Sequence, residues 1–464
     1  MGPESLLASV ILSSMAGTGA GFCTGLVPGL HVNNLAAIVV ASSSSAVAFF
    51  TLLVGNDESA LPGLMVSCFL VSALVAHMFS EAIVSTYLGI PSGDTVSLLP
   101  AHRLAKSGLG ACAVRVSAQG SLFGVVAGIV LLPPICFLLG SPVDAYSSLK
   151  SVMGVLVVLL SAVLLLSEGV NRQRPVRRVV LATVFFTLSG TIGLIVLDSN
   201  YFACQLPDFP WMARDFVGRS SLLLPMFAGL FGVPTVLLSI QSEPRIRSSS
   251  RARGDAGDDL SVKASARDLG FMSLGGLLVG WIPGMTSGSS ATLCSLGTKR
   301  ALPEGGTNSE AARFIWLYSA VASMGAVLSV GALFAIARAR SGIMQAVEFF
   351  YGSSVDGMLD LHSSEPLVAL LLAMLLSAVV SHAVMVALSG RTLESVQHIL
   401  CSRTTAFASL GFVVSLVLVL TGTRGGLILV TSVSLGLLPP TLGLRRIDLM
   451  GCILVPIAAT FLLG

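Results

Sequence analysis

The chain has 464 residues, of which 54% are hydrophobic and only 11% are charged, and its mean hydropathy is +0.90. Soluble domains carry about 25% charged residues, so this chain has too few charges to cover a water-facing surface. Its formal net charge of +3 is too small to identify a partner. The composition excludes a soluble enzyme, a disordered chain and a nucleic-acid-binding domain, and it predicts an all-α protein that crosses a lipid bilayer many times.

Ten apolar windows have the length of membrane helices, which need about 20 mostly apolar residues. They are 62–88, 109–139, 149–167, 177–197, 219–241, 312–337, 366–389, 404–421, 425–440 and 447–463. Two further apolar stretches, 5–54 and 268–297, are interrupted by Gly and Pro. The first is long enough for either a re-entrant hairpin or two full spans, so we expect about 10–12 membrane helices.

The basic residues divide and orient the chain, because Lys and Arg collect on the cytoplasmic side of membrane proteins. The acid-free basic loop at 172–178 and the Ser-rich basic segment 242–267 are separated by two spans, so both are expected inside. Segment 242–267 is then a cytoplasmic linker between an N-terminal transmembrane unit, 1–241, and a C-terminal one, 268–464. The basic residues at 338–340 fall on the outer side, against this rule.

A short sequence occurs once near the start of each half. Residues 21–36 read GFCTGLVPGLHVNNLA and residues 276–291 read GLLVGWIPGMTSGSSA. Aligned without a gap, they share five positions: Gly21/Gly276, Gly25/Gly280, Pro28/Pro283, Gly29/Gly284 and Ala36/Ala291. The match indicates an internal repeat.

The Pro-Gly pair in each copy predicts a broken helix. Pro lacks a backbone donor, and the Gly after it adopts conformations that other residues avoid. The alternative is that these glycines only pack helices closely, as small-xxx-small motifs do. A break exposes backbone groups, which lipid tolerates only where protein or water satisfies them. Breaks at matching places in two halves are the pattern expected of a transporter binding site.

Polar residues follow each break. Hydroxyls, amides and free helix N-termini coordinate carboxylates, and unwound carbonyls coordinate Na⁺. The predicted substrate site therefore combines both segments: Gly25, Pro28, Gly29, His31, Asn33, Asn34, Gly280, Pro283, Gly284, Thr286, Ser287, Ser289 and Ser290.

The number of crossings predicts how the halves are related. Each half is expected to hold one broken segment and five spans. If each broken segment is a re-entrant hairpin, each half crosses an odd number of times, so the halves are inverted repeats whose hairpins enter from opposite faces. Two full spans in 5–54 would leave this parity unchanged.

Three further residues are candidates for coupling to an ion. His77 and Glu81 lie four residues apart, so they share a helix face within the membrane and could carry protons, unless Glu81 is simply solvated at the interface. Asp94 lies in a Pro-Ser-Gly-Asp loop, where it is either a turn residue or a cation ligand. The eight cysteines form no metal-binding pattern, so we expect no cofactor and no metal beyond Na⁺ or H⁺ as a coupling ion.

With these residues in view, the chain resembles the large permease subunit of the tripartite tricarboxylate transporters, in an archaeal-type branch of unknown function. The resemblance covers both Pro-Gly segments, LGIPSGDTVSLLPAHRLAKSG at 88–108, GLFGVPTVLLS at 229–239 and GLLPPTLGLRRIDLMG at 436–451. It implies secondary active transport of an organic anion, driven by H⁺ or Na⁺, in the cytoplasmic membrane of a prokaryote. It also implies two partners, a small membrane subunit and an extracytoplasmic binding protein.

The sequence thus favours a carrier for a carboxylate-bearing solute, working by alternating access between two inverted halves. An intramembrane protease is an alternative, because Gly288-Ser289-Ser290 contains a Gly-x-Ser element for which His382 could act as the base. A passive channel or a lipid flippase is a third possibility.

Overall fold

The computed structural model describes residues 3–54, 61–88, 98–170, 173–198, 222–241, 262, 264–296, 307–352, 364–388 and 402–463. Within these ranges every regular element is a helix, as the composition predicts. Asp94 and most of the predicted linker lie outside the described residues.

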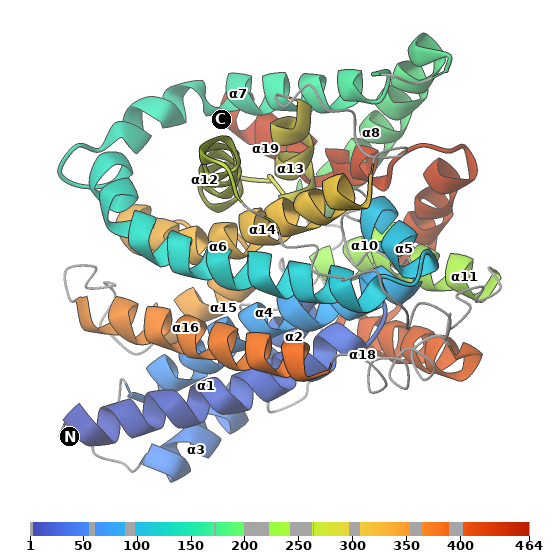
Figure 1. Cartoon of the computed structure of the whole chain (residues 1–464). Coiled ribbons are helices and arrows are strands. Elements are labelled where there is room, and N and C mark those ends of the chain that lie inside the picture. Colours follow the sequence, from blue (N-terminus) through green and yellow to red (C-terminus); the bar gives the residue numbers. More distant parts are fainter. Residues whose placement is uncertain are drawn as a thin grey trace, which may run out of the picture.

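The helices of the two halves follow one another in a similar order (Figure 1). The first half contains α1 (Pro3–Leu26), α2 (Val32–Ala41), α3 (Ser43–Val54), α4 (Leu61–Leu88), α5 (Leu98–Lys106), α6 (Gly110–Leu139), α7 (Ala145–Ser167), α8 (Pro175–Asp198), α10 (Leu223–Phe227), the π-helical turn η2 (Ala228–Gly232) and α11 (Val233–Gln241). The second half contains α12 (Ala266–Trp281), α13 (Ser287–Leu296), α14 (Asn308–Ile336), α15 (Gly342–Gly352), α16 (Ser364–Ala387), α18 (Arg403–Thr441), the 3₁₀ turn η3 (Arg446–Met450) and α19 (Gly451–Leu463). Each half thus opens on a broken pair, which α3 follows in the first half only. Each half then continues with a long helix and a short one and closes on a short apolar helix.

Nine of the described helices are long and apolar enough to cross a membrane, and the pair α2–α3, bent by 84°, would make a tenth. Helix α18 counts once in that number, but its 39 residues would extend about 58 Å, nearly twice the hydrocarbon thickness of about 30 Å. Gly422 interrupts it with a φ of 62°. Helix α18 is therefore two helices, as the separate windows 404–421 and 425–440 predicted.

The predicted window 219–241 is occupied by α10, η2 and α11 rather than by one regular helix. Pro234 has no backbone N–H to complete the regular ladder, and the π-helical turn η2 directly precedes Val233 and Pro234. Helices α5 and α15 were not predicted as elements, because 9 and 11 residues are too few for a search based on membrane spans.

Helices α4 and α14 form the buried centre of the molecule. In their most apolar windows 78% and 83% of the residues are buried, against 22% to 39% in α1, α6, α7, α8, α16 and α18. The outer helices carry exposed apolar side chains such as Val130, Leu166 and Val430. A multi-pass membrane protein needs such an outer surface, because its surroundings are hydrocarbon.

Glycine stripes bring the helices of each broken pair onto this centre. A Cβ on Gly21 would lie 2.1 Å from the backbone oxygen of Ala73, and one on Gly276 would lie 2.7 Å from Met324. Helix α1 therefore packs directly on α4, and α12 packs on α14. These two glycines act as packing residues, which is the alternative that the sequence left open.

One long helix of each half packs against the central helix of the other half. Helix α6 of the first half packs along α14 of the second, and α16 packs along α4. The terminal helices also pack on the other half: α10, η2 and α11 pack on α18, and α19 packs on α7 and α8. In Figure 1, α1 and α16 lie side by side below the centre, and α7, α8 and α19 lie above it.

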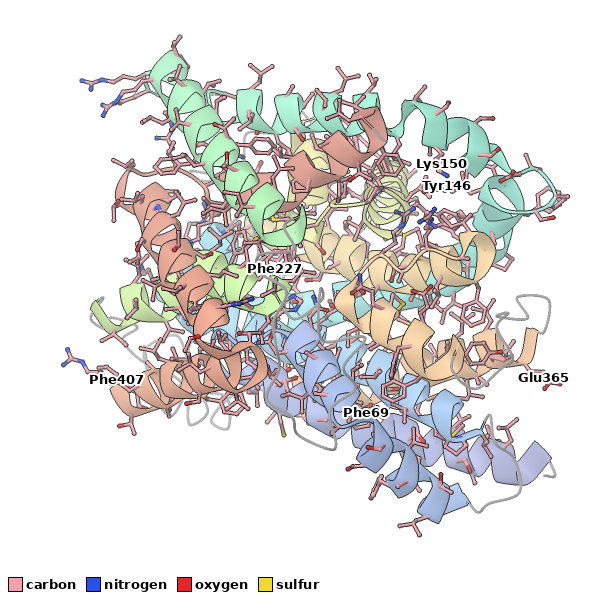
Figure 2. The ribbon with its side chains drawn as sticks, turned by 180° about the vertical axis from the view of Figure 1, so that it is seen from behind. Phe69, Tyr146, Lys150, Phe227, Glu365 and Phe407 are labelled. Atoms are coloured by element: carbon pink, nitrogen blue, oxygen red, sulfur yellow. The ribbon has the colours of Figure 1, made fainter. Side chains whose placement is uncertain are left out.

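Helices α4 and α14 start at opposite ends of the centre. His102 of α5 lies 3.2 Å from the carbonyl of Thr86, near the end of α4, and Arg103 donates to the carbonyl of Thr307, directly before α14. Helix α14 therefore starts where α4 ends. At its other end Arg340 donates to the Tyr146 hydroxyl at 2.8 Å, and Figure 2 shows Tyr146 at the start of α7.

Candidate functional site

The first Pro-Gly pair breaks the chain as predicted. Helix α1 ends at Leu26 and α2 begins at Val32, with Gly29 between them at a φ of 81°. This φ lies in the left-handed region that disfavours residues with a Cβ. The Ser409 hydroxyl of α18 donates to the Pro28 carbonyl, so part of the exposed backbone is satisfied by another helix.

The second pair repeats this conformation. Helix α12 ends at Trp281, Gly284 has a φ of 78°, and α13 begins at Ser287. The chain then folds back on itself, because Ser290 donates to the Gly275 carbonyl at 2.8 Å and the Cys294 thiol lies 3.4 Å from the Phe271 carbonyl. Helices α12 and α13 form a hairpin.

Each left-handed glycine lies against the terminal helix of its own half. A Cβ on Gly29 would lie 3.1 Å from Val236 of α11, and one on Gly284 would lie 2.9 Å from Leu454 and Ile457 of α19. The two breaks thus have matching backbone conformations and matching neighbours. In the view of Figure 1, α6 and α14 lie between α2 and the α12–α13 hairpin. That one solute contacts both breaks therefore stays a prediction.

Titratable side chains gather at the first break. The rings of His31 and His77 lie 5.8 Å apart between centroids. His77 Nδ1 lies 3.0 Å from the Thr24 hydroxyl, and its Nε2 lies 3.5 Å from a Glu81 carboxylate oxygen. The structure therefore brings together residues that the sequence assigned separately to substrate binding and to ion coupling.

His31 is the most exposed member of this group. Its side chain is exposed, although its chain neighbours Leu30 and Val32 and the facing His77 are buried. It also caps α2, since its Nδ1 accepts a hydrogen bond from the backbone N–H of Asn33 at 3.2 Å. The ring is therefore both exposed and in contact with a helix N-terminus.

The other polar residues after the first break point elsewhere. A Cβ on Gly342, at the start of α15, would lie 3.1 Å from the side-chain oxygen of Asn33. Asn34 is buried. Gly25 packs against α4, where a Cβ would lie 2.1 Å from the Ser80 hydroxyl and 2.6 Å from the His77 carbonyl. Gly25 therefore holds α1 close to His77.

The hydroxyls after the second break bond to one another. The Thr286 and Ser289 hydroxyls lie 2.8 Å apart, and Ser289 also accepts from the Thr286 backbone N–H at 2.9 Å. Ser289 and Ser290 are fully buried, and Ser287 begins α13. Gly280 packs on α14, with Leu328 Cβ 2.6 Å from an added Cβ. The Thr286 and Ser289 hydroxyls of the second break therefore form hydrogen bonds within the break itself.

The same contacts bear on the protease alternative. Ser290 Oγ donates its proton to the Gly275 carbonyl, and no contact between Ser290 and His382 occurs among the described residues. Ser290 thus has the hydrogen bond of a packing residue.

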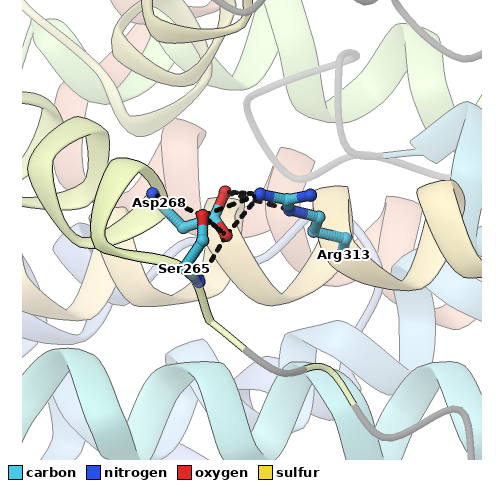
Figure 3. Close-up of polar contacts among 3 residues, drawn as sticks. All are labelled: Ser265, Asp268 and Arg313. Carbon is cyan, nitrogen blue, oxygen red and sulfur yellow. Dashed lines mark hydrogen bonds and ion pairs between the residues drawn. The ribbon is translucent and has the colours of Figure 1, made fainter.

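The sequence did not predict an ion pair at the start of α12, the helix that leads into the second break. Asp268 accepts from Arg313 of α14 through Nε at 2.9 Å and Nη2 at 2.6 Å, and from the Ser265 N–H and hydroxyl at 2.8 and 2.7 Å (Figure 3). Burial raises the pKa of Asp268, but the hydrogen bonds from Arg313 and Ser265 outweigh it and hold that pKa below its ordinary value. The Ser-x-x-Asp spacing of a capping box was the available signal.

A second ionic cluster joins the two halves. The buried carboxylate of Glu168, at the end of α7, accepts from Arg178 of α8 at 2.9 Å and from Nε of Arg445, which directly precedes η3. Arg445 also donates to the Ser167 hydroxyl at 2.7 Å, and Arg446 donates to the Thr235 hydroxyl. The basic segment that ends at Arg178 and the basic residues before η3 therefore lie together.

Comparison with known proteins agrees with this architecture. The family model described as "Tripartite tricarboxylate transporter TctA family" matches residues 11–451. An uncharacterized protein of Methanocaldococcus jannaschii is 26% identical over 341 residues, which cover 73% of this chain and 72% of that protein. No solved structure matches the chain. Since the family match spans both broken helices and nearly the whole sequence, the chain belongs to the tripartite tricarboxylate transporter TctA family, a family of membrane transport proteins.

Proposed function

We propose that this protein is a secondary active transporter that moves a small carboxylate-bearing solute by alternating access, coupled to H⁺ or Na⁺. The transport class follows from the family. The observation that carries the mechanism is the pair of left-handed glycines, Gly29 and Gly284, which end two helices and start two others at matching places. Such breaks turn helix N-termini toward the interior of a transporter.

The anion is held, in this proposal, at the N-terminus of α2. The first backbone N–H groups of a helix carry partial positive charge. In α2 those of Asn33 and Asn34 already donate to His31, so the anion is attracted by the positive end of the helix and by the His31 ring. His31 caps this terminus and is exposed, so an arriving carboxylate meets a ring N–H and the start of the helix together. No lysine or arginine lies within 31–41, so this segment itself forms no fixed ion pair with the anion.

Alternating access is supported by how the halves are packed. Helices α4 and α14 start from opposite ends of the centre, and each half packs its next long helix, α6 or α16, along the central helix of the other half. Opposed directions are what two inverted repeats require. A rocking motion of one half would then open the site to either side in turn.

The proposed partners are those that the family name implies. A tripartite system pairs a permease with a small membrane subunit and an extracytoplasmic binding protein, and we propose that this chain is the permease. Its proposed location is the cytoplasmic membrane of a prokaryote.

A binding screen tests the proposal. Purified protein is melted with citrate, succinate and a neutral sugar of similar size, each with and without Na⁺. We expect a carboxylate to raise the melting temperature, because a ligand that binds only the folded state stabilises it by about 2.7 kcal/mol at 100 times its Kd. Equal melting temperatures with every carboxylate and with the sugar would contradict the proposed substrate class.

A further inference from the structure

Both nitrogens of the His77 ring face polar groups. Nδ1 lies 3.0 Å from the Thr24 hydroxyl, which also lies 2.9 Å from the Gly21 carbonyl. This hydroxyl can donate its one proton to either acceptor, so it accommodates His77 with Nδ1 protonated or unprotonated.

The other ring nitrogen faces a carboxylate. This buried atom, Nε2, has no hydrogen bond in the structure, and a Glu81 oxygen lies 3.5 Å from it. A proton held between the two groups, on either Nε2 or Glu81, would let them form a hydrogen bond with each other.

The pair has one buried and one reachable member. The His77 side chain is 2% exposed, whereas that of Glu81 is 28% exposed. Glu81 gives the proton a route to water, and His77 retains it in the interior. A buried site with one accessible carboxylate is suited to loading and unloading a proton.

We propose that His77 and Glu81 together bind one exchangeable proton, and that this proton is the ion coupled to anion transport. The second part rests on the proposed function. His31 links the two events, since its ring lies 5.8 Å from that of His77 and its Nδ1 caps α2. Loading the proton removes a negative charge next to the anion site, and anion binding in turn favours the proton, because the coupling is reciprocal.

Polar groups from several neighbouring elements lie near the pair. Helix α1 offers the Thr24 hydroxyl, and the break before α2 offers His31. Helix α5 contacts α4 through His102 at Thr86, beyond Glu81 along the helix. Helix α16 contacts α4 through Ser377 at Ser72 and carries His382 further along.

The proton itself is tested by NMR on isotope-labelled histidine in lipid nanodiscs, comparing the native chain with His77→Gln to assign the signal. We expect the His77 ring to titrate together with Glu81, and Glu81→Gln to abolish that shared titration. A His77 signal that does not titrate, or a spectrum unchanged by Glu81→Gln, would overturn the proton site whether or not the protein transports anything.

Coupling is tested in proteoliposomes that hold a pH-sensitive dye, with citrate as the probe. We expect citrate to drive proton entry in the native protein and in the control His102→Gln. Entry should fall at least tenfold in His77→Gln and Glu81→Gln, whose folding is checked by size-exclusion chromatography. The Kd for citrate should rise by about tenfold for each pH unit above the titration of the pair in native protein, and stay flat in Glu81→Gln.

The outcomes separate the two proposals. Citrate uptake that follows a Na⁺ gradient alone and is unchanged in His77→Gln would overturn the coupling proton and leave the carrier intact. No uptake of citrate or succinate under any gradient would contradict the carrier itself, and with it the coupling.

Discussion

The two breaks have the same backbone conformation but differ in their polar side chains. Gly29 and Gly284 have nearly the same φ, 81° and 78°, and each contacts the terminal helix of its own half. At the first break an exposed histidine caps the next helix and faces a second histidine. At the second break the Thr286 and Ser289 hydroxyls bond to each other.

The two copies of the repeat therefore share the backbone conformation of the break but not the side chains around it. The second break is anchored by an ion pair at the start of α12, between Asp268 and Arg313, and its hydroxyls are already used. The first break has titratable groups instead of an anchor. We therefore infer that the first break does the binding and the second supplies a rigid counterpart.

The largest effect is expected at the glycines. Gly29→Val and Gly284→Val each place a β-branched side chain at positive φ, which costs about 1–3 kcal/mol, and each forces the break to change shape. Both variants should insert into the membrane but lose citrate uptake. Gly422→Val is the matched control, because Gly422 also has positive φ, 62°, but no atom lies within 4 Å of an added Cβ. Normal uptake by both break variants would refute the site.

The anchor of the second break comes next. Asp268→Asn removes the charge that Arg313 pairs with, which should lower stability by about 1.5–3 kcal/mol, measured by thermal melting. Because the pKa of Asp268 is held below its ordinary 3.8, the native pair stabilises fully at neutral pH and is lost only as the pH falls through that lowered pKa. Native and variant stabilities should therefore converge in strong acid. A constant difference at all pH values would contradict the ion pair.

The smallest effects separate the polar side chains that follow the two breaks. Thr286→Ala removes hydroxyl bonds within the second break and should cost about 1 kcal/mol of stability, with the citrate Kd unchanged. His31→Ala removes the cap of α2 at a similar cost, but it should also weaken citrate binding about tenfold, or about 1.4 kcal/mol. Calorimetric titration of both variants distinguishes them. Equal losses of affinity would mean that both breaks contact the anion.

Much of the fold could be predicted from hydropathy. The windows 62–88 and 109–139 coincide with α4 and α6 to within a residue, since continuous apolar length is the signal that a bilayer imposes. The breaks were predicted from Pro and Gly because those residues act through their own backbone. Helices α5 and α15 were missed, since neither has the length of a span.

The sequence indicates which polar residues lie near the breaks, but it does not indicate how they are arranged in space. The spacing of His77 and Glu81 indicated one helix face, but only the packing of α1 on α4 brings Thr24 and His31 to them. The ion-pair partner of Asp268 could not be predicted either, because Arg313 lies on another helix. The roles of Ser289 and Ser290 as substrate ligands remain predictions, and both hydroxyls have partners within the protein.

A cryo-EM structure of the protein in nanodiscs with saturating citrate tests the central claim most directly. We predict density for a carboxylate within hydrogen-bonding distance, about 3 Å, of the His31 ring and the first backbone N–H groups of α2. The density should disappear in Gly29→Val. Citrate bound elsewhere, with the N-terminus of α2 unchanged from the apo state, would contradict the claim that the broken helix holds the transported anion.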